Sequence, residues 1–395
     1  MKFIVLHCDG VADEKVEELG YRTPLEVAKT PNIDFLAERS ELGLYEPIPK
    51  GLHPGSDVGT LSLLGYDPTK YYTGRAPLEA ASLGIELHEK DVAFRCNLVS
   101  VRENGGDFIM EDYSGGHLTA EEGKILMEVI QRELGNSIMT FYPGVGYRNI
   151  LVWKEGPLEA KIPPPHDIMG KKVNEFIEGY KVIKKMFKRS YEILSNHPLN
   201  VKRASEGKRP ANAIWLWGQG KTPKIPTLKE IYNIDSAVIS AVDLVRGIGK
   251  LAGMKIINVP GATGYMDTNF KGKVEACVAA LKEVDLVVLH VEGIDEVSHT
   301  GDAQKKVEAI EIYDFEVVGR LLENLKGFKN FKILLTSDHR TPVRIKTHSH
   351  GPVPYLIFSS DSNKKTGLRW TESDCAKGNY LPLGYELFKR FIKEK

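Results

Sequence analysis

Residues 286–302 read LVVLHVEGIDEVSHTGD, a short Val- and Leu-rich run followed by acidic and histidine residues. The run Leu286–Val291 is typical of a strand buried on both faces, as in a parallel sheet. Asp295 and His299 then stand four residues apart, a spacing that places both side chains on one face of a helix. The stretch therefore predicts a buried strand followed by a helix that carries a carboxylate and an imidazole.

The same order of apolar run and polar cluster occurs twice more in the chain. Phe3–Leu6 leads to Asp9, and Ile333–Leu335 leads to Asp338 and His339. Residues 305–325 have apolar side chains at helical spacing, so strands alternate with helices, and this alternation predicts an α/β fold. Its core is a mainly parallel sheet with helices on both faces. Because ligands bind beyond the carboxyl ends of such strands, we expect the three polar clusters to converge on one site.

The middle of the chain differs from its two ends. The chain has 395 residues, of which 42% are hydrophobic, and this length suggests two domains. From about Ala76 to about Ile234 the sequence has many loops and Pro-rich patches such as residues 162–165. We expect residues 1–75 and 235–395 to form a discontinuous core. Residues 76–234 would form a smaller inserted α/β (α+β) domain.

Composition excludes several classes of partner. Lys plus Arg and Asp plus Glu both total 53, so the balance of charge points to neither nucleic acid nor an anionic membrane. The first apolar run is too short for a signal peptide, and no later run has the length of a membrane span. The four cysteines are scattered and form no CxxC pair. We expect a cytoplasmic protein with reduced thiols.

The acidic and histidine residues together suggest metal binding. Carboxylate and imidazole ligands suit Zn²⁺ and Mn²⁺. His348 and His350 add two histidines at alternate positions of an extended segment. Each feature alone has a simpler interpretation, as a surface ion pair, a helix cap or solvated loop histidines. Taken together near predicted strand ends, they are sufficient for two metal sites.

Ser56 follows Pro54-Gly55 and opens an apolar periodic run. This pattern predicts a helix N-terminus, at which Ser56 or Asp57 is a simple cap. The same geometry suits a nucleophile, because free N–H groups and the helix dipole favour a phosphate on the serine oxygen. A metal in contact with the hydroxyl would activate it. The loop alone leaves cap and nucleophile as alternatives.

Two glycine-rich stretches resemble nucleotide-binding motifs but lack the required spacing. Residues 218–222 read GQGKT, yet Trp215 stands where a P-loop needs glycine. Residues 247–250 read GIGK, and the third glycine of a dinucleotide fingerprint would be Gly253, one position late. Such motifs need their full spacing, so no nucleotide is expected.

Several long stretches resemble the archaeal-type cofactor-independent (2,3-bisphosphoglycerate-independent) phosphoglycerate mutases, a branch of the alkaline phosphatase superfamily. The resemblance covers nearly the whole chain. The stretches that carry it are PGSDVGTLSLLGYDP (54–68), YYTGRAPLEAASLGIEL (71–87), DVAFRCNLVSV (91–101), DYSGGHLTAEE (112–122), IWLWGQG (214–220), PGATGYMDTNF (260–270), HVEGIDEVSHTGD (290–302) and SDHRTPVRIKTHSHGPVPY (337–355).

The resemblance implies an alkaline-phosphatase-like core with two divalent metal ions, Mn²⁺, Mg²⁺ or Zn²⁺, and no 2,3-bisphosphoglycerate. It assigns one ion to Asp9, Ser56, Asp338 and His339, and the other to Asp295, His299 and His348. His348 is preferred to His350 because it keeps the family's distance to Pro352-Val353-Pro354. His117 is similar to a histidine that binds the substrate phosphate. The remaining substrate-binding candidates are basic residues of the insert, Arg75, Arg95, Arg148 and Arg203, each of which also fits a structural ion pair.

The implied reaction is the interconversion of 3-phosphoglycerate and 2-phosphoglycerate in glycolysis, an isomerase reaction. Ser56 would carry the phosphoryl group as phosphoserine, while domain closure keeps water out. The alternatives within the superfamily are a homoserine kinase-type phosphotransferase and a metal-dependent phosphatase. A metal-stabilised binding protein is the alternative from another class, and it gives Ser56 no role, because structural metal sites are filled by protein ligands.

Overall fold

The computed structural model describes residues 1–393 and divides the chain into two compact units. The first unit contains residues 1–72 together with those from 224 onward, and the second contains residues 73–223. The expected insert of residues 76–234 therefore needs correction at both ends. Thr73 belongs to the second unit, where its hydroxyl donates to the carbonyl of Lys221. Leu228 belongs to the first unit, where its N–H donates to the carbonyl of Ala252.

The first unit is built on an eight-stranded sheet with the order β13-β2-β12-β11-β1-β10-β8-β9. Five pairs of neighbouring strands are parallel: β1 with β10, β1 with β11, β10 with β8, β8 with β9 and β13 with β2. β12 runs antiparallel to both of its neighbours, β11 and β2. The expected mainly parallel sheet is confirmed. The strands are β1 (Lys2–Cys8), β2 (Ser40–Tyr45), β8 (Ser236–Ile239), β9 (Lys255–Ile257), β10 (Leu286–Val291), β11 (Phe331–Thr336), β12 (Val353–Ser359) and β13 (Asn379–Leu381).

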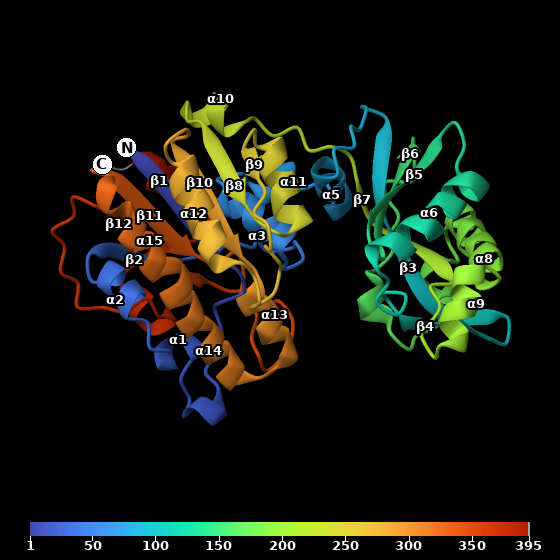
Figure 1. Cartoon of the computed structure of the whole chain (residues 1–395), viewed down its shortest axis with the longest axis horizontal. Helices are drawn as coiled ribbons and strands as arrows, with labels where there is room; N and C mark the ends of the chain where they lie inside the picture. The colour runs from blue at the N-terminus through green and yellow to red at the C-terminus, as the bar shows by residue number, and fades with distance from the viewer. Residues whose placement is uncertain (394–395) are drawn as a thin grey trace. The chain divides into compact units, whose positions relative to one another are not determined.

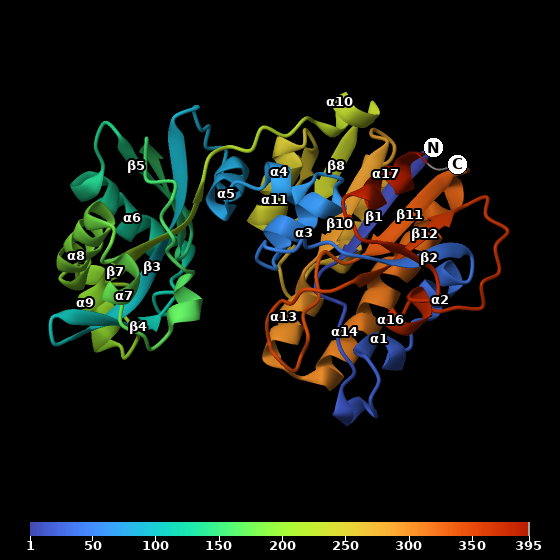
Figure 2. The same ribbon diagram turned by 180° about the vertical axis from the view of Figure 1, so that it is seen from behind.

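Helices cover both faces of this sheet, as Figures 1 and 2 show from opposite sides. One face packs against α2 (Pro31–Ala37), α12 (Phe270–Ala280), α14 (Ala303–Tyr313) and α15 (Arg320–Asn324), with a π-helical segment at 314–319. The other face is covered by α3 (Ser56–Leu63), α11 (Asp243–Leu251) and α17 (Glu386–Lys393). The other α-helices described in this unit are α1 (Pro24–Val27), α4 (Pro68–Tyr71), α10 (Leu228–Tyr232), α13 (Gly293–Thr300) and α16 (Glu372–Cys375).

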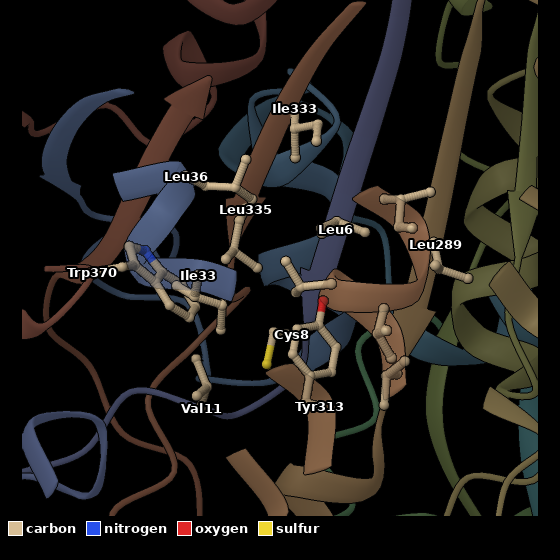
Figure 3. Close-up of a cluster of buried hydrophobic side chains, with 14 of the residues drawn as sticks. Leu6, Cys8, Val11, Ile33, Leu36, Leu289, Tyr313, Ile333, Leu335 and Trp370 are labelled. Carbon is tan, nitrogen blue, oxygen red and sulfur yellow. The ribbon is translucent and has the colours of Figure 1, made fainter. Parts of the chain in front are cut away.

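Strand alternation divides the central side chains between the two faces. Leu6 and Cys8 of β1 point to the core shown in Figure 3, where they meet Ile33 of α2 and Tyr313 of α14. Phe3 lies on the opposite face, and its ring packs edge-on against Phe391 of α17 with centroids 5.4 Å apart. Each such side chain contributes roughly 1.5–3 kcal/mol when fully buried. This two-sided burial explains why the central strands are almost continuously apolar.

The second unit has its own antiparallel sheet, so it is of the α+β type. The order is β4-β3-β6-β5, and β7 also pairs with β3. Trp215, Phe94 and Phe187 belong to a separate apolar core in this unit. Its strands are β3 (Asp91–Asn104), β4 (Asp107–Asp112), β5 (Met139–Val145), β6 (Arg148–Lys154) and β7 (Ala213–Gly220). Its helices are α5 (Arg75–Ser82), α6 (Ala120–Leu134), α7 (Asn174–Ile177), α8 (Lys181–Ser195) and α9 (Pro198–Ser205).

Among residues 1–393, no helix is long and apolar enough to cross a membrane.

Candidate active site

The carboxyl edge of the large sheet gathers the polar clusters expected from the sequence. β11, β1 and β10 are neighbours in the sheet, and each is followed by ligand-type side chains. Asp9 follows β1, Asp338 and His339 follow β11, and Asp295 lies on α13 after β10. Parallel strands end at the same edge of a sheet, which is why residues so distant in sequence meet here.

A first cluster consists of Asp9, Asp338 and His339, all buried. One potential ligand atom from each lies within 4.8 Å of those of the other two. Nε2 of His339 is 3.4 Å from an oxygen of Asp9 and 3.5 Å from an oxygen of Asp338. Burial and the nearby charges of Asp338 and Asp295 raise the pKa of Asp9 well above its usual value. The cluster is therefore short of positive charge.

Ser56 joins this cluster through the packing of α3. Its hydroxyl oxygen lies 3.1 Å from Nε2 of His339. Gly59, one turn further along α3, faces the backbone of Asp338, and an added Cβ would be 2.1 Å from the Asp338 carbonyl oxygen. Glycine at this position lets α3 approach the sheet edge closely. The N-cap is Gly55, so the cap role considered for Ser56 is wrong and its hydroxyl is not used to cap the helix.

A second cluster contains Asp295, His299 and His348. Nε2 of His299 lies 3.0 Å from Oδ2 of Asp295, as four-residue spacing on a helix predicts. Nε2 of His348 lies 3.5 Å from the same oxygen, whereas His350 is exposed and belongs to neither cluster. Burial alone would lower the pKa of His299, but the hydrogen bond and charge of Asp295 raise it to about 9. The pKa of Asp295 is held well below its usual value, because the hydrogen bond from His299 and the nearby imidazoles of His348 and His339 outweigh burial.

Hydrogen bonds at Nδ1 orient two of the histidine rings. The Lys346 carbonyl lies 3.0 Å from Nδ1 of His299 and can only accept, so Nδ1 carries the proton there. Nδ1 of His339 lies 3.1 Å from Oγ1 of Thr341, whose own hydroxyl donates to Asp295. Both rings therefore keep Nε2 directed at the carboxylates, and burial lowers the pKa of His339 to about 4, which keeps this ring neutral. This arrangement is typical of metal-binding histidines.

The donor set fits divalent cations. Within residues 1–393, four buried atoms have no hydrogen-bond partner: Oδ1 of Asp9, both carboxylate oxygens of Asp338 and Nε2 of His348. Leaving such atoms unsatisfied is costly, and a cation held by carboxylates and imidazoles would satisfy them. Each of the two clusters offers three potential ligand atoms, and Ser56 could add a hydroxyl to the first.

Four residues of this edge were not singled out from the sequence. Buried His7 and His290 stand opposite each other in the register of β1 and β10, and with Asp9 they form a third carboxylate–imidazole group. Thr341 and Ser240 contact His339 and His290. The only available signal was a histidine inside each of two apolar runs, which marks a buried polar side chain near a strand end.

In the second unit, three of the four candidate arginines gather around one buried carboxylate. Oε1 of Glu79 accepts from Nε of Arg75 at 2.8 Å and lies 3.0 Å from Nη1 of Arg95. The guanidinium of Arg95 also stacks on Trp217, 4.7 Å from its ring centre, and its Nε finds no hydrogen-bond partner among the described residues. Burial and the charges of Arg75 and Arg148, offset in part by Glu79, lower the pKa of Arg95 to about 10. The charges of Arg95, Arg75 and Arg148 all act on Glu79 and lower its pKa despite its burial.

The other two candidates lie elsewhere in this unit. Arg203 is buried and fully engaged, since it donates to both carboxylate oxygens of Glu122 and to the carbonyls of Gly115, Gly116 and Arg209. Its expected role in substrate binding is therefore replaced by a structural one. His117 follows in the loop that Arg203 holds, with an exposed side chain and a backbone φ of 55°.

Fold and site together define a class: an α/β enzyme whose parallel sheet presents carboxylates, imidazoles and a helix-terminal serine at its carboxyl edge. The family model of 2,3-bisphosphoglycerate-independent phosphoglycerate mutases matches residues 37–200. A mutase of that name from Methanosarcina barkeri is 46% identical, over 97% of this chain and 96% of its own. The chain belongs to this family.

Solved structures agree with the fold. A protein of Pyrococcus horikoshii, 30% identical, superposes with a TM-score of 0.82 over 100% of this chain and 98% of its own. A cofactor-independent phosphoglycerate mutase of Thermoplasma acidophilum, 26% identical, gives a TM-score of 0.64 over 100% and 99% of the two chains. The names of the relatives favour the mutase over the kinase and phosphatase alternatives.

Proposed function

We propose that this protein interconverts 3-phosphoglycerate and 2-phosphoglycerate by passing the phosphoryl group through Ser56. The observation that carries the proposal is the place of the Ser56 hydroxyl, at the N-terminus of α3 and 3.1 Å from Nε2 of His339. A helix N-terminus favours a phosphate, and buried carboxylates and imidazoles beside it provide sites for cations. The phosphoryl group would stay on the protein, so no 2,3-bisphosphoglycerate is needed.

Two divalent ions, Mn²⁺, Mg²⁺ or Zn²⁺, fit this site. Asp9, Ser56, Asp338 and His339 would hold one, and Asp295, His299 and His348 the other. When bound, the ions supply positive charge that offsets the charge of the phosphoryl oxygens.

The chain's own groups then account for the transfer. Oγ of Ser56 forms a bond to phosphorus as the bond from phosphorus to O3 of the substrate breaks, and the serine proton ends on O3 of glycerate. The 2-hydroxyl of glycerate next takes the phosphoryl group, which restores the serine hydroxyl and yields 2-phosphoglycerate. The N–H groups of the first turn of α3 stabilise the phosphoserine.

The arginine group of the second unit is our candidate for substrate binding. The charges of Arg75, Arg95 and Arg148 all act on Glu79, and the Nε of Arg95, which has no hydrogen-bond partner among residues 1–393, could donate to the carboxylate or phosphate of the substrate. Planar guanidinium groups bind such anions through paired hydrogen bonds. His117 remains a candidate for contact with the phosphate. A small phosphorylated acid of central metabolism also agrees with the cytoplasmic location expected above.

The test is to incubate the manganese-loaded protein with 3-phosphoglycerate, without ATP or 2,3-bisphosphoglycerate. After removal of the metal, phosphorus NMR should show 2-phosphoglycerate as the product. Release of inorganic phosphate alone would indicate a phosphatase. No change with 3-phosphoglycerate, followed by phosphorylation of homoserine with ATP, would indicate the kinase.

A further inference from the structure

A chain of hydrogen bonds crosses three neighbouring strands behind Asp9. Ser240 directly follows β8, His290 lies in β10 and Asp9 follows β1, and these strands are adjacent in the sheet. Oγ of Ser240 lies 2.9 Å from Nδ1 of His290. Nε2 of His290 lies 2.9 Å from Oδ2 of Asp9. All three side chains are buried, so water does not compete for these contacts.

The direction of each hydrogen bond follows from the chemistry of the groups. The N–H of Val242 donates to Oγ of Ser240 at 3.0 Å, which leaves the serine proton free to point at the histidine. Asp9 in its ionised form, the form that would bind a cation, only accepts, so Nε2 of His290 carries the ring proton and donates it to Asp9. Nδ1 then holds the lone pair and accepts from Ser240.

This arrangement uses one oxygen of Asp9 and leaves the other available. Oδ2 accepts from His290. Oδ1 is buried, has no hydrogen-bond partner in the described part of the chain and lies 3.4 Å from Nε2 of His339. A carboxylate fixed in this way cannot rotate to present the wrong oxygen. Residues that orient ligands from behind in this manner commonly contribute 10–100-fold to metal affinity.

We propose that Ser240 and His290 are positioning residues that fix the His290 tautomer and hold Asp9 with Oδ1 directed at a divalent cation. The inference rests on the proposed role of Asp9 as a metal ligand. Ser240 acts on the site only through His290, because it contacts neither Asp9 nor His339 in the hydrogen-bond chain described above.

The geometry favours this role over a third metal site. His7, Asp9 and His290 lie close enough to share an ion. A histidine can bind a cation only through a nitrogen lone pair, and His290 has none to offer. Its Nδ1 lone pair receives the Ser240 proton, and its Nε2 carries the proton donated to Asp9.

The test compares Ser240→Ala with Ser40→Ala. Ser40 is equally buried in the same sheet, and its hydroxyl donates to the carbonyl of Leu36, away from the metal clusters. Titration of each metal-free protein with Mn²⁺ gives affinity and stoichiometry. We expect two ions per chain in the parent protein, a roughly 10–100-fold lower affinity in Ser240→Ala and unchanged affinity in Ser40→Ala.

Two further measurements separate positioning from a general structural effect. His290→Gln retains an N–H donor and should keep more Mn²⁺ affinity than His290→Leu. Nitrogen-15 NMR of labelled histidines in the zinc-loaded protein should show the Nε2–H tautomer for His290, and a mixture of tautomers in Ser240→Ala.

The outcomes distinguish this inference from the proposed function. Unchanged Mn²⁺ affinity in Ser240→Ala, or three ions per chain in the parent protein, would overturn the positioning role. Asp9→Asn provides the check on the site itself. If that variant binds Mn²⁺ as the parent does, Asp9 is not a ligand and the proposed metal site is wrong, whereas loss in Asp9→Asn without loss in Ser240→Ala rejects only the inference made here.

Discussion

The hydroxyl of Thr341 donates a hydrogen bond of 2.6 Å to Oδ1 of Asp295. Oγ1 of Thr341 in turn accepts a hydrogen bond from Nδ1 of His339 at 3.1 Å. His339 belongs to the first carboxylate–imidazole cluster and Asp295 to the second, so one buried hydroxyl joins the two. The two clusters are therefore expected to respond together when this contact is changed.

Thr341→Val tests this connection because it removes the hydroxyl and keeps the shape of the side chain. We expect weaker Mn²⁺ binding, by about 10–100-fold, since both His339 and Asp295 lose a partner that orients them. Thr366→Val is the control, because its hydroxyl donates to the Ala37 carbonyl, outside both clusters. Equal loss of affinity in the two variants would show that the effect is not specific to Thr341.

Ser56→Ala should abolish phosphoryl transfer while leaving the fold intact. The N-cap of α3 is Gly55, so the substitution removes no side-chain cap. We expect turnover of 3-phosphoglycerate to fall by several orders of magnitude with little change in melting temperature, because no other group replaces the nucleophile. Near-normal turnover in this variant would contradict a phosphoserine mechanism.

Removal of divalent ions should lower stability as well as activity. Asp9, Asp338 and Asp295 place three buried carboxylates close together, and burial with their mutual repulsion raises the pKa of Asp9. A cation that binds only the folded chain stabilises it by about 2.7 kcal/mol at a concentration 100 times its Kd. Thermal unfolding of chelator-treated protein, with and without added Mn²⁺, measures this stabilisation as a difference in melting temperature. Equal melting temperatures would argue against the metal sites.

Arg95→Lys tests the arginine group of the second unit. Lysine keeps the charge but loses the planar fork, so we expect KM for 3-phosphoglycerate to rise by about 10–100-fold, the equivalent of one charge-assisted hydrogen bond. Arg102→Lys is the matched control on the same strand, where the arginine is exposed and pairs with Glu111. An unchanged KM in Arg95→Lys, with normal folding, would remove Arg95 from the substrate site.

Lys306 is expected to be essential for stability. Its amine is fully buried and donates to Asp13 and to the carbonyls of Gly10 and Thr341, which ties together the loops after β1 and β11. Lys306→Met leaves Asp13 buried without this partner, and we expect a loss of about 3–5 kcal/mol in urea unfolding. The neighbouring Lys305 is exposed, so Lys305→Met should change the free energy of unfolding by less than about 0.5 kcal/mol. Similar midpoints for the two variants would contradict the role of the buried pair.

Local patterns were sufficient for the main elements of the fold. The apolar runs after Met1, before Glu292 and before Ser337 became β1, β10 and β11, because strands buried on both faces must be apolar throughout. Four-residue spacing likewise placed Asp295 and His299 on one face of α13. The polar residues that end these strands were therefore identified from the sequence, although their roles as ligands remain a proposal.

Other features depended on contacts between distant segments. Arginine is a residue type that binds anionic substrates, and this made Arg203 a candidate. Its guanidinium is instead hydrogen-bonded to Glu122 and to three backbone carbonyls. The boundaries of the second unit also differ from the expected ones, because Thr73 and Leu228 form hydrogen bonds to residues that local composition does not reveal.

By itself, the sequence determined that a parallel sheet would present carboxylates and histidines at its carboxyl edge, because hydrophobic periodicity is a local property. Only the tertiary structure decided which of these groups meet. Ser56 reaches His339 across 283 residues, His290 faces Asp9 across 281, and His348 approaches Asp295 while His350 is exposed. Strand order and the close approach of α3 at Gly59 set these contacts, and both result from packing of the whole core rather than from any single segment.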